Sequence, residues 1–591
     1  MDVLTTLKRL ADAKSAQTKA WNDTQGLVTT DYDILTTQVA ALRRGELDGE
    51  MSVLRDLDGA EMPDTVRNKI LESVKNNEQT VSSVETLLSN SFYGSDIIYV
   101  KGIPATGSDL SRAFANCYSL YAVLGVSFVN AVYASELFKS CYSLRAIKLS
   151  DGDFAKSYSV NSLFEACKSI NVLTLPSGSF AVATDVRAMF SGCSSLTELT
   201  LPEGSFGAVT NANNMFYGCS SLTELTLPEG SFGAVTSALQ MFDFCRSLTE
   251  LTLPEGSFGA VNDAKAMFYG CRSLTVLTLP EGSFGAVTNA SYMFYVCSSL
   301  TLLTLPEGSF GAVKNANNMF DGCRSLTELT LPDGSFGSVT NASYMFYECS
   351  SLTVLTLPEG SFGAVTSITA IFQNCSSLTS LTFSEGSLGQ CETASNIFYG
   401  CKALKSVILP ATFSAKSINN AFLNCSSLTS IDLHGMTRQA VQMYRLFNGC
   451  ILLKSVTGLD LSGVALTVDD LLNANIGITT SGAEESFSIV VQYLFYGCNS
   501  LSDCRLNGIL YKSGVNLQLA KMLSAESLYS WVKALYDWET NNDGKTTDDE
   551  DHVLYMSASQ QQTLTDYTGE NGENGEDAYL EAIAKGWTIL N

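Results

Sequence analysis

The chain has 591 residues, of which 45% are hydrophobic and 16% are charged, and its formal net charge is -25. This length exceeds what one core supports, so we expect several domains or a repeat array, and the composition excludes a disordered chain. The acidic balance, with no cluster of lysines or arginines, argues against nucleic acid as a partner.

Residues 1–91 form the first predicted unit, a helical N-terminal segment. Apolar residues alternate at spacings of four and three over 28–42 and 70–88, and Asn77 takes a core position in the second stretch. Such heptads predict a coiled-coil stem in which a lone Asn fixes the register of a homo-oligomer, for example a trimer. The alternative is a helical bundle that caps the unit that follows.

The start of the chain also bears on localisation. Residues 1–21 lack the apolar run of a secretory signal, and no stretch of 18 apolar residues occurs anywhere in the chain. We therefore expect synthesis in a cytoplasm and no insertion into a membrane.

Residues 92–510 form the second unit, a repeat array. Eleven cysteines from Cys141 to Cys401 stand 26 residues apart, and four more extend the series to fifteen. Each of the fifteen has a Phe three residues earlier. A fixed period of this length indicates a solenoid, in which a coil buries its inner face only against its neighbours. We predict about fifteen coils of 26 residues.

One coil shows how the apolar residues are arranged. LTELTL, residues 196–201, predicts a short strand with its leucines inward, and EGSFG, residues 203–207, predicts a turn with Phe206 inward. A stripe at i, i+3, i+4 and i+7 then predicts a two-turn helix. Its members are Ala212, Met215, Phe216 and Cys219. The predicted fold class is thus an α/β solenoid.

The cysteine column is interpreted as a small hydrophobic side chain that fills a narrow inner slot. Metal binding or redox chemistry is the alternative, and it would require paired cysteines or histidines at ligand spacing. No C-x-x-C occurs in the chain. We expect no metal and no cofactor in the repeats.

Two columns are predicted to lie at the surface of the solenoid. Glu203 and its equivalents every 26 residues form an acidic edge, with cation sites or a docking strip for a basic partner as the alternative. The residues around the Met-Phe pair differ between coils. Tyrosines at these positions are good contact residues on a rigid rod. This predicted helical face is the candidate binding surface, unless it varies because nothing constrains it. Its members are Tyr217, Asp243, Tyr269, Tyr292, Tyr295, Tyr344 and Tyr347.

Residues 511–591 form the third unit, an acidic capping region of mixed secondary structure. Residues 524–538 predict a helix with one apolar face, formed by Leu528, Trp531, Val532 and Leu535. The final residues, 578–590, predict a helix that leads into an apolar strand. A solenoid needs such a cap, because its last coil lacks a neighbour.

Residues 539–550 imitate a calcium-binding loop. The ligand positions would be Glu539, Asn541, Asp543 and Glu550. A solvated acidic loop is the preferred interpretation, because the first ligand is Glu rather than Asp and Thr546 replaces the usual apolar residue.

Catalytic patterns are missing from the sequence. The two histidines, His434 and His552, lie far apart in sequence, and no P-loop, dinucleotide fingerprint or H-E-x-x-H occurs. We expect a protein that is not an enzyme.

The coil LTLPEGSFGAVTNANNMFYGCSS, residues 199–221, resembles the BspA-like leucine-rich repeats, in which a Phe, a Cys and a following S-L-T precede the strand. Such repeats occur in bacterial surface adhesins, protozoan surface proteins and phage proteins. The resemblance implies a binding role for proteins or matrix rather than catalysis. The ending AIAKGWTIL, residues 582–590, also resembles the termini of repeat proteins from gut Bacteroidales and their phages, including crAss-like phages.

Because no export signal is visible, our first expectation is a phage virion protein, a tail or head fibre or decoration. Its N-terminal helices would contact other virion proteins, and its rod would bind a host-surface protein or glycan through many weak contacts. The first alternative is a bacterial or protozoan adhesin, at the cell surface or secreted. The second is an intracellular protein-interaction scaffold.

Overall fold

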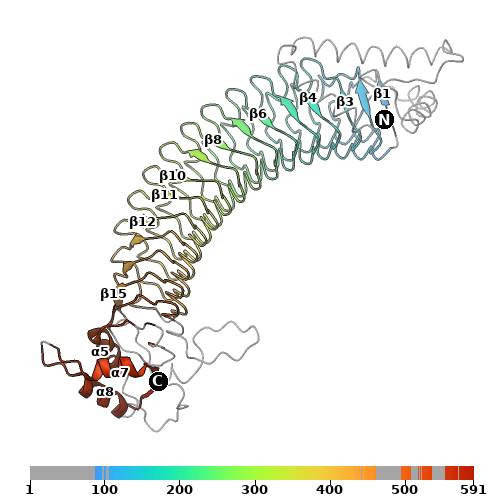
Figure 1. The fold of residues 1–591 in the computed structure, drawn as a ribbon. Coiled ribbons are helices and arrows are strands. Elements are labelled where there is room, and N and C mark those ends of the chain that lie inside the picture. The colour runs from blue at the N-terminus through green and yellow to red at the C-terminus, as the bar shows by residue number, and fades with distance from the viewer. Residues whose placement is uncertain are drawn as a thin grey trace, which may run out of the picture.

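The computed structural model describes residues 87–95, 97, 99–101, 105–440, 442–460, 494–507, 517, 520, 522–535, 553–569 and 571–590. Over this part of the chain the repeats stack into a curved rod that ends in a small helical region (Figure 1). The predicted stem with Asn77 lies outside the described residues. So does the calcium-loop candidate formed by Glu539, Asn541, Asp543 and Glu550.

Each coil contributes one short strand, and its middle residue is buried while the two flanking residues face outward in most coils. Neighbouring strands are parallel, with equivalent residues in register, as Leu329 and Leu355 are. The strands are β1 (Tyr99–Lys101), β2 (Ala122–Leu124), β3 (Ala146–Ile147), β4 (Val172–Thr174), β5 (Glu198–Thr200), β6 (Glu224–Thr226), β7 (Glu250–Thr252), β8 (Val276–Thr278), β9 (Leu302–Thr304), β10 (Glu328–Thr330), β11 (Val354–Thr356), β12 (Ser380–Thr382), β13 (Ser406–Ile408), β14 (Ser430–Asp432), β15 (Ser455–Asp460) and β16 (Asp503–Asn507).

About 13 turns of the rod keep the length of about 26 residues, fewer than the fifteen predicted. The cysteine series overestimates the number because its ends depart from the period. Cys117 lies 24 residues before Cys141, and Cys498 lies 48 residues after Cys450.

The segment predicted as a two-turn helix is a turn, residues 213–218, so the fold is a β-solenoid and the α/β prediction is wrong. Asn214 and Gly218 have φ values of 56° and 69°, which an α-helix does not allow. The amide of Phe216 donates to the carbonyl of Met241 in the next coil at 2.8 Å rather than within its own segment. The predicted inward stripe is nonetheless buried: Ala212, Met215, Phe216 and Cys219.

Two columns of stacked rings run through the core. Phe216 and Phe242 lie 5.3 Å apart with an interplanar angle of 7°, and Phe206 and Phe232 lie 5.3 Å apart at 13°. The predicted inward leucines of the strand, among them Leu199, are buried beside them. Each coil therefore adds one slice of core that is complete only between two neighbours.

The cysteine column is buried, as predicted, and all seventeen cysteines are free thiols. Each repeat thiol also has a partner that the sequence did not reveal, since Cys219 Sγ donates to the carbonyl of Phe190 at 3.1 Å. Burial raises the pKa of the Cys219 thiol well above its usual value. The column is therefore unreactive and hydrogen-bonded.

A small helical region covers the last coil. Helix α5 (Ala525–Lys533) begins at the cap Ser524 and buries Leu528, Trp531 and Val532, as predicted. Trp531 packs against Phe495 at 5.8 Å and donates through Nε1 to the carbonyl of Cys504 at 3.0 Å. The region also contains α7 (Ala558–Thr565), α8 (Gly575–Ala584) and the parallel pair β17 (Val553–Tyr555) and β18 (Thr588–Leu590). Within the described ranges, every helix is too short or too polar to cross a lipid bilayer.

Candidate functional site

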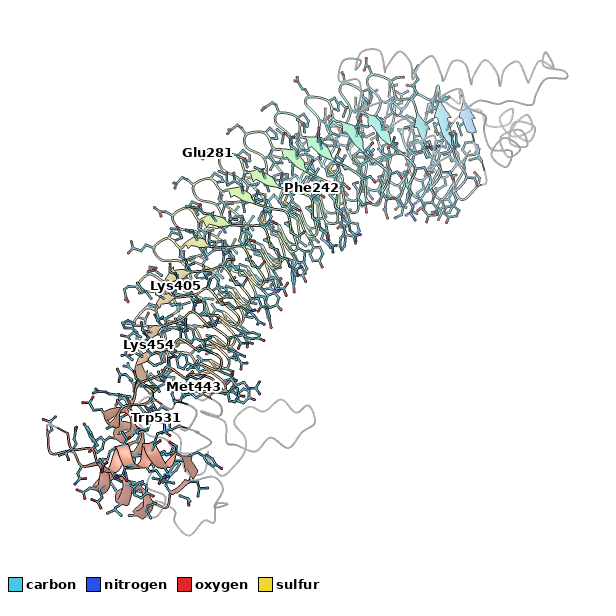
Figure 2. All side chains as sticks on the ribbon, viewed as in Figure 1. Phe242, Glu281, Lys405, Met443, Lys454 and Trp531 are labelled. Carbon is cyan, nitrogen blue, oxygen red and sulfur yellow. The ribbon has the colours of Figure 1, made fainter. Side chains whose placement is uncertain are left out.

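Between residues 151 and 400 each coil has two six-residue turns, which we name the first turn (residues 203–208 and equivalents) and the second turn (residues 213–218 and equivalents). From residue 203 to residue 364 the first turn is nearly the same in every coil. Its buried serines form a ladder in which Ser205 Oγ donates to the carbonyl of Ser179 at 2.9 Å. It carries the predicted glutamate column, and Figure 2 shows Glu281 at the convex edge of the rod. These carboxylates are exposed, which fits a solvated edge.

The fifth position of the second turn forms a different column, which we name the tyrosine column. One residue per coil contributes to it, and five of its six residues between 217 and 347 belong to the predicted binding face. Its members are Tyr217, Asp243, Tyr269, Tyr295, Asp321 and Tyr347. Because the coils are in register, these side chains follow one another along the rod.

Ring contacts hold the tyrosine column together. The rings of Tyr269 and Tyr295 stack at 4.7 Å with an interplanar angle of 17°. Tyr292 meets Tyr295 edge-on at 5.7 Å, and Tyr344 meets Tyr347 in the same way at 5.8 Å. The structure thus brings six of the seven predicted residues into ring contacts with one another or with a neighbouring ring.

Asp243 interrupts the column and is 2% exposed. Its Oδ2 accepts a hydrogen bond from Gln240 Nε2 at 2.8 Å, and its buried Oδ1 has no hydrogen-bond partner. The nearby amide of Phe244 is committed to the carbonyl of Tyr269 at 2.8 Å. Burial raises the pKa of the Asp243 carboxyl to about 6, against the smaller opposing effect of the Gln240 hydrogen bond.

Asp321 is the second carboxyl in the column and is 8% exposed. Asn318 Nδ2 donates to its Oδ2 at 2.6 Å. Burial raises its pKa to about 6, opposed by the Asn318 hydrogen bond. Burial and neighbouring carboxylates, Asp321 among them, also raise the pKa of Tyr295. Both aspartates are therefore largely buried carboxyls beside aromatic rings, and nearby Arg324 partly offsets the rise in the pKa of Asp321.

The backbone around the column is strained. Left-handed φ values of 56° to 59° occur at non-glycine residues of the second turn. At its sixth position, other coils place Gly218 or Gly270. For a non-glycine residue this conformation costs roughly 1–2 kcal/mol. The strained residues beside the column are Phe244, Tyr292, Val296, Tyr344 and Glu348. The same conformation recurs along the rod, for example at Phe206, Ala266 and Ala370, so it belongs to the coil and does not single out the column.

Sequence reasoning missed several members of this surface. Gln240, Phe244 and Glu348 had no individual signal, because their positions vary in type from coil to coil. Asp321 had one, since it stands three periods of 26 after Asp243. The prediction also placed the face on a helix, whereas it lies on turns.

The chemistry available at this surface is that of binding. It presents tyrosine edges and hydroxyls, two buried carboxyls and the amides of Gln240 and Asn318. Among the described residues, no group of three or more His, Cys, Asp or Glu side chains could hold a metal ion. His434 is exposed, and its Nε2 lies 3.6 Å from Asp432 Oδ2.

Several solved structures are similar to this chain. A leucine-rich repeat protein from Bacteroides ovatus is 17% identical, covers 73% of this chain and 82% of its own, and has a TM-score of 0.35. A leucine rich cell surface protein from Faecalibacterium prausnitzii is 21% identical over 56% of this chain and 82% of its own, with a TM-score of 0.29. An internalin from Listeria monocytogenes is 15% identical over 58% and 83%, with a TM-score of 0.22.

Among proteins with curated descriptions, none matches the sequence significantly. The family model described as BspA type Leucine rich repeat region matches in six overlapping copies. They cover residues 67–170, 111–232, 160–283, 210–343, 264–388 and 340–460, which is well over half of the chain. The chain belongs to the BspA-type leucine-rich repeat family.

Proposed function

We propose that this protein is an adhesin-like binding protein, which holds partner proteins along its rod at a cell surface and performs no catalysis. The observation that carries the proposal is the tyrosine column with its ring contacts. We place the surface adhesin, an alternative in the sequence analysis, ahead of the virion protein because family membership is shown and a phage origin is not.

The physical argument rests on rigidity. Tyrosine supplies a large contact area with few rotatable bonds, so little conformational entropy is lost when it is buried in an interface. The ladders that join the coils hold successive tyrosines at fixed spacing, as the 4.7 Å contact of Tyr269 and Tyr295 shows. A preorganised row of this kind binds a partner without a folding cost.

The test measures binding of the full chain to a panel of purified extracellular matrix proteins by surface plasmon resonance. We expect at least one to bind, and we expect Tyr269→Ala/Tyr295→Ala to weaken that binding about tenfold or more. The matched control is Tyr118→Ala/Tyr142→Ala, which removes another stacked pair, 5.0 Å apart, from the N-terminal coils. No binding to any matrix protein, or equal losses in both variants, would contradict the proposal.

A virion protein is the second candidate, and it is supported by the resemblance of the ending AIAKGWTIL to proteins of gut Bacteroidales phages. Two experiments separate the candidates. Proteolysis of intact producing cells removes the chain only if it is displayed on their surface, which also excludes an intracellular scaffold. Mass spectrometry of purified phage particles finds the chain only if it is part of the virion.

A further inference from the structure

The residue that follows each repeat cysteine forms a further column along the rod. Between residues 168 and 402 this column contains serine in five coils and a cation in the other five, namely Lys168, Arg246, Arg272, Arg324 and Lys402. Only Arg246 and Arg272 occupy consecutive coils, and we name them the arginine pair. Both side chains are exposed. In the core of the same two coils the rings of Phe242 and Phe268 lie 5.4 Å apart, so the coils are separated by about one strand spacing.

Arg324 shows how this chain pairs such an arginine internally. Its guanidinium forms an ion pair with Glu348, which stands 24 residues later at the sixth position of the next second turn. At the same offset from the two members of the arginine pair stand Gly270 and Val296. Neither residue is acidic, and within the described ranges no ion pair involves either member. The arginine pair therefore lacks the carboxylate that Arg324 has.

Aromatic rings border the arginine pair. The Cζ atom of Arg246 lies 5.2 Å from the centre of the Phe244 ring. That ring meets Tyr269 of the tyrosine column edge-on at 5.3 Å. Burial raises the pKa of the Tyr269 hydroxyl, and the charge of Arg272 opposes this rise, so Arg272 lies close enough to act on Tyr269. Both arginines therefore lie beside the tyrosine column, and a partner that covers the tyrosines also reaches them.

A guanidinium that stacks on a ring can still bind an anion. Stacking uses the face of the planar group, whereas its N–H bonds point outward from its edges. A carboxylate accepts two of these N–H bonds in parallel. Two neighbouring guanidinium groups also repel each other, and a carboxylate between them compensates both charges. The arginine pair is thus suited to a carboxylate that comes from outside the chain.

We propose that Arg246 and Arg272 bind an aspartate or glutamate side chain of the partner protein that covers the tyrosine column. The inference rests on the proposed protein-binding function and names the chemistry of the partner. The partner's carboxylate would act as Glu348 acts on Arg324 within the chain. In this arrangement the tyrosines supply contact area, and the arginine pair fixes the orientation of the partner.

A sulfated polysaccharide is the other class of anionic ligand. Such a chain carries many charges, whereas this protein has a net charge of -25 and exposed glutamates in the first turns of the same coils. Repulsion over a Debye length of about 8 Å opposes a polyanion more than it opposes a single carboxylate. We therefore treat binding of a sulfated oligosaccharide as an outcome that the test must distinguish.

The test measures the affinity of the full chain for two short peptides by saturation-transfer NMR. Each is a Gly/Ser peptide with capped ends and one central residue, which is glutamate in one peptide and glutamine in the other. The two peptides differ in charge and hardly in shape. We expect the glutamate peptide to bind about tenfold more tightly, and Arg246→Gln/Arg272→Gln should remove this preference. A heparin disaccharide is the third probe.

The chain offers two matched variants. Val296→Glu gives Arg272 an internal carboxylate 24 residues away, as in the existing ion pair further along the rod. Val296 and Glu348 have the same φ of 56°, so the backbone already accommodates a glutamate at this position of the turn. The preference for the glutamate peptide should weaken in this variant although both arginines are present. Arg324→Gln removes an arginine that is already paired, and the preference should stay at the wild-type level. Thermal unfolding of each variant checks that its fold is intact.

Three results would overturn the inference. They are equal binding of the glutamate and glutamine peptides, a preference that survives Arg246→Gln/Arg272→Gln, and arginine-dependent binding of the heparin disaccharide in place of the glutamate peptide. If matrix-protein binding is lost in Tyr269→Ala/Tyr295→Ala while the double glutamine variant changes neither that binding nor the peptide preference, the proposed function stands and this inference fails. If no matrix protein binds at all, the proposed function fails independently of the peptide result.

Discussion

The first and second turns of a coil have the same length and each contains two left-handed residues, yet their sequences behave in opposite ways. The first turn keeps the same residues from coil to coil because its left-handed Phe206 is buried in a stack of rings and its Ser205 extends a ladder of hydrogen bonds. In the second turn the Met-Phe pair faces the core, and most of the other positions lie at or just beneath the surface, with Asp243 and Asp321 buried there. Side chains there can change without loss of the core, so the second turn is where this rod can acquire specificity.

The prediction with the largest expected effect tests whether the first and second turns share one core. Phe258→Ala in the first turn and Phe268→Ala in the second each remove one ring from a stack, with neighbours 5.7 Å and 5.4 Å away. We expect each to lower the free energy of unfolding by about 3–5 kcal/mol, measured by urea denaturation. Tyr269→Ala, at the surface, should cost far less. A small loss at Phe258 would show that the first turn is not part of the same core.

An intermediate effect tests the buried carboxyl of the second turn. The folded-state pKa of Asp243, about 6, lies above its ordinary value of 3.8, so the folded protein binds a proton more tightly than the unfolded chain. The stability that this proton supplies is fully present below about pH 4 and is lost as the pH rises through about 6. Because an amide does not titrate, Asp243→Asn should not lose this stability as the pH rises.

We therefore expect Asp243→Asn to be more stable than the wild type by about 1–3 kcal/mol at pH 7.5, and the difference to shrink toward pH 4. Urea denaturation at a series of pH values measures it. The control is Asp333→Asn in the exposed first turn, where the difference should be small at every pH. A difference for Asp243→Asn that does not vary with pH would contradict the assigned titration.

Sequence periodicity predicted the solenoid, its inward residues and its cap because burial repeats with the coil. It failed on local backbone, since the spacing of Ala212, Met215, Phe216 and Cys219 fits a helix and a tight turn equally well. What distinguishes them is the left-handed φ of Asn214 and the hydrogen bonds to the next coil. A single coil sequence carries little information about either.

The candidate surface was predictable in outline and not in detail. Tyrosines in variable positions marked the face, but the difference between Asp243 and Asp321 depends on the residue that follows each one. Phe244 follows the first and its ring contacts Tyr269, whereas the second is followed by Gly322, which lies against Val296 of the preceding coil. Such pairwise compensation appears only when rings from neighbouring coils are placed side by side.

The smallest expected effect tests whether the second turn sacrifices stability for its surface. Val296 is left-handed, at φ 56°, where Gly270 and Gly322 occupy the same position in the adjacent coils. Val296→Gly should raise the free energy of unfolding by about 1 kcal/mol, because a β-branched residue is strained there. Val296→Ala is the control, since it shortens the side chain and keeps the strain. The Val296 side chain lies beside Gly322, where an added Cβ would come within 3.2 Å of it. If Val296→Gly is the less stable protein, that packing outweighs the strain, and variation in the second turn reflects fit between coils rather than selection for binding.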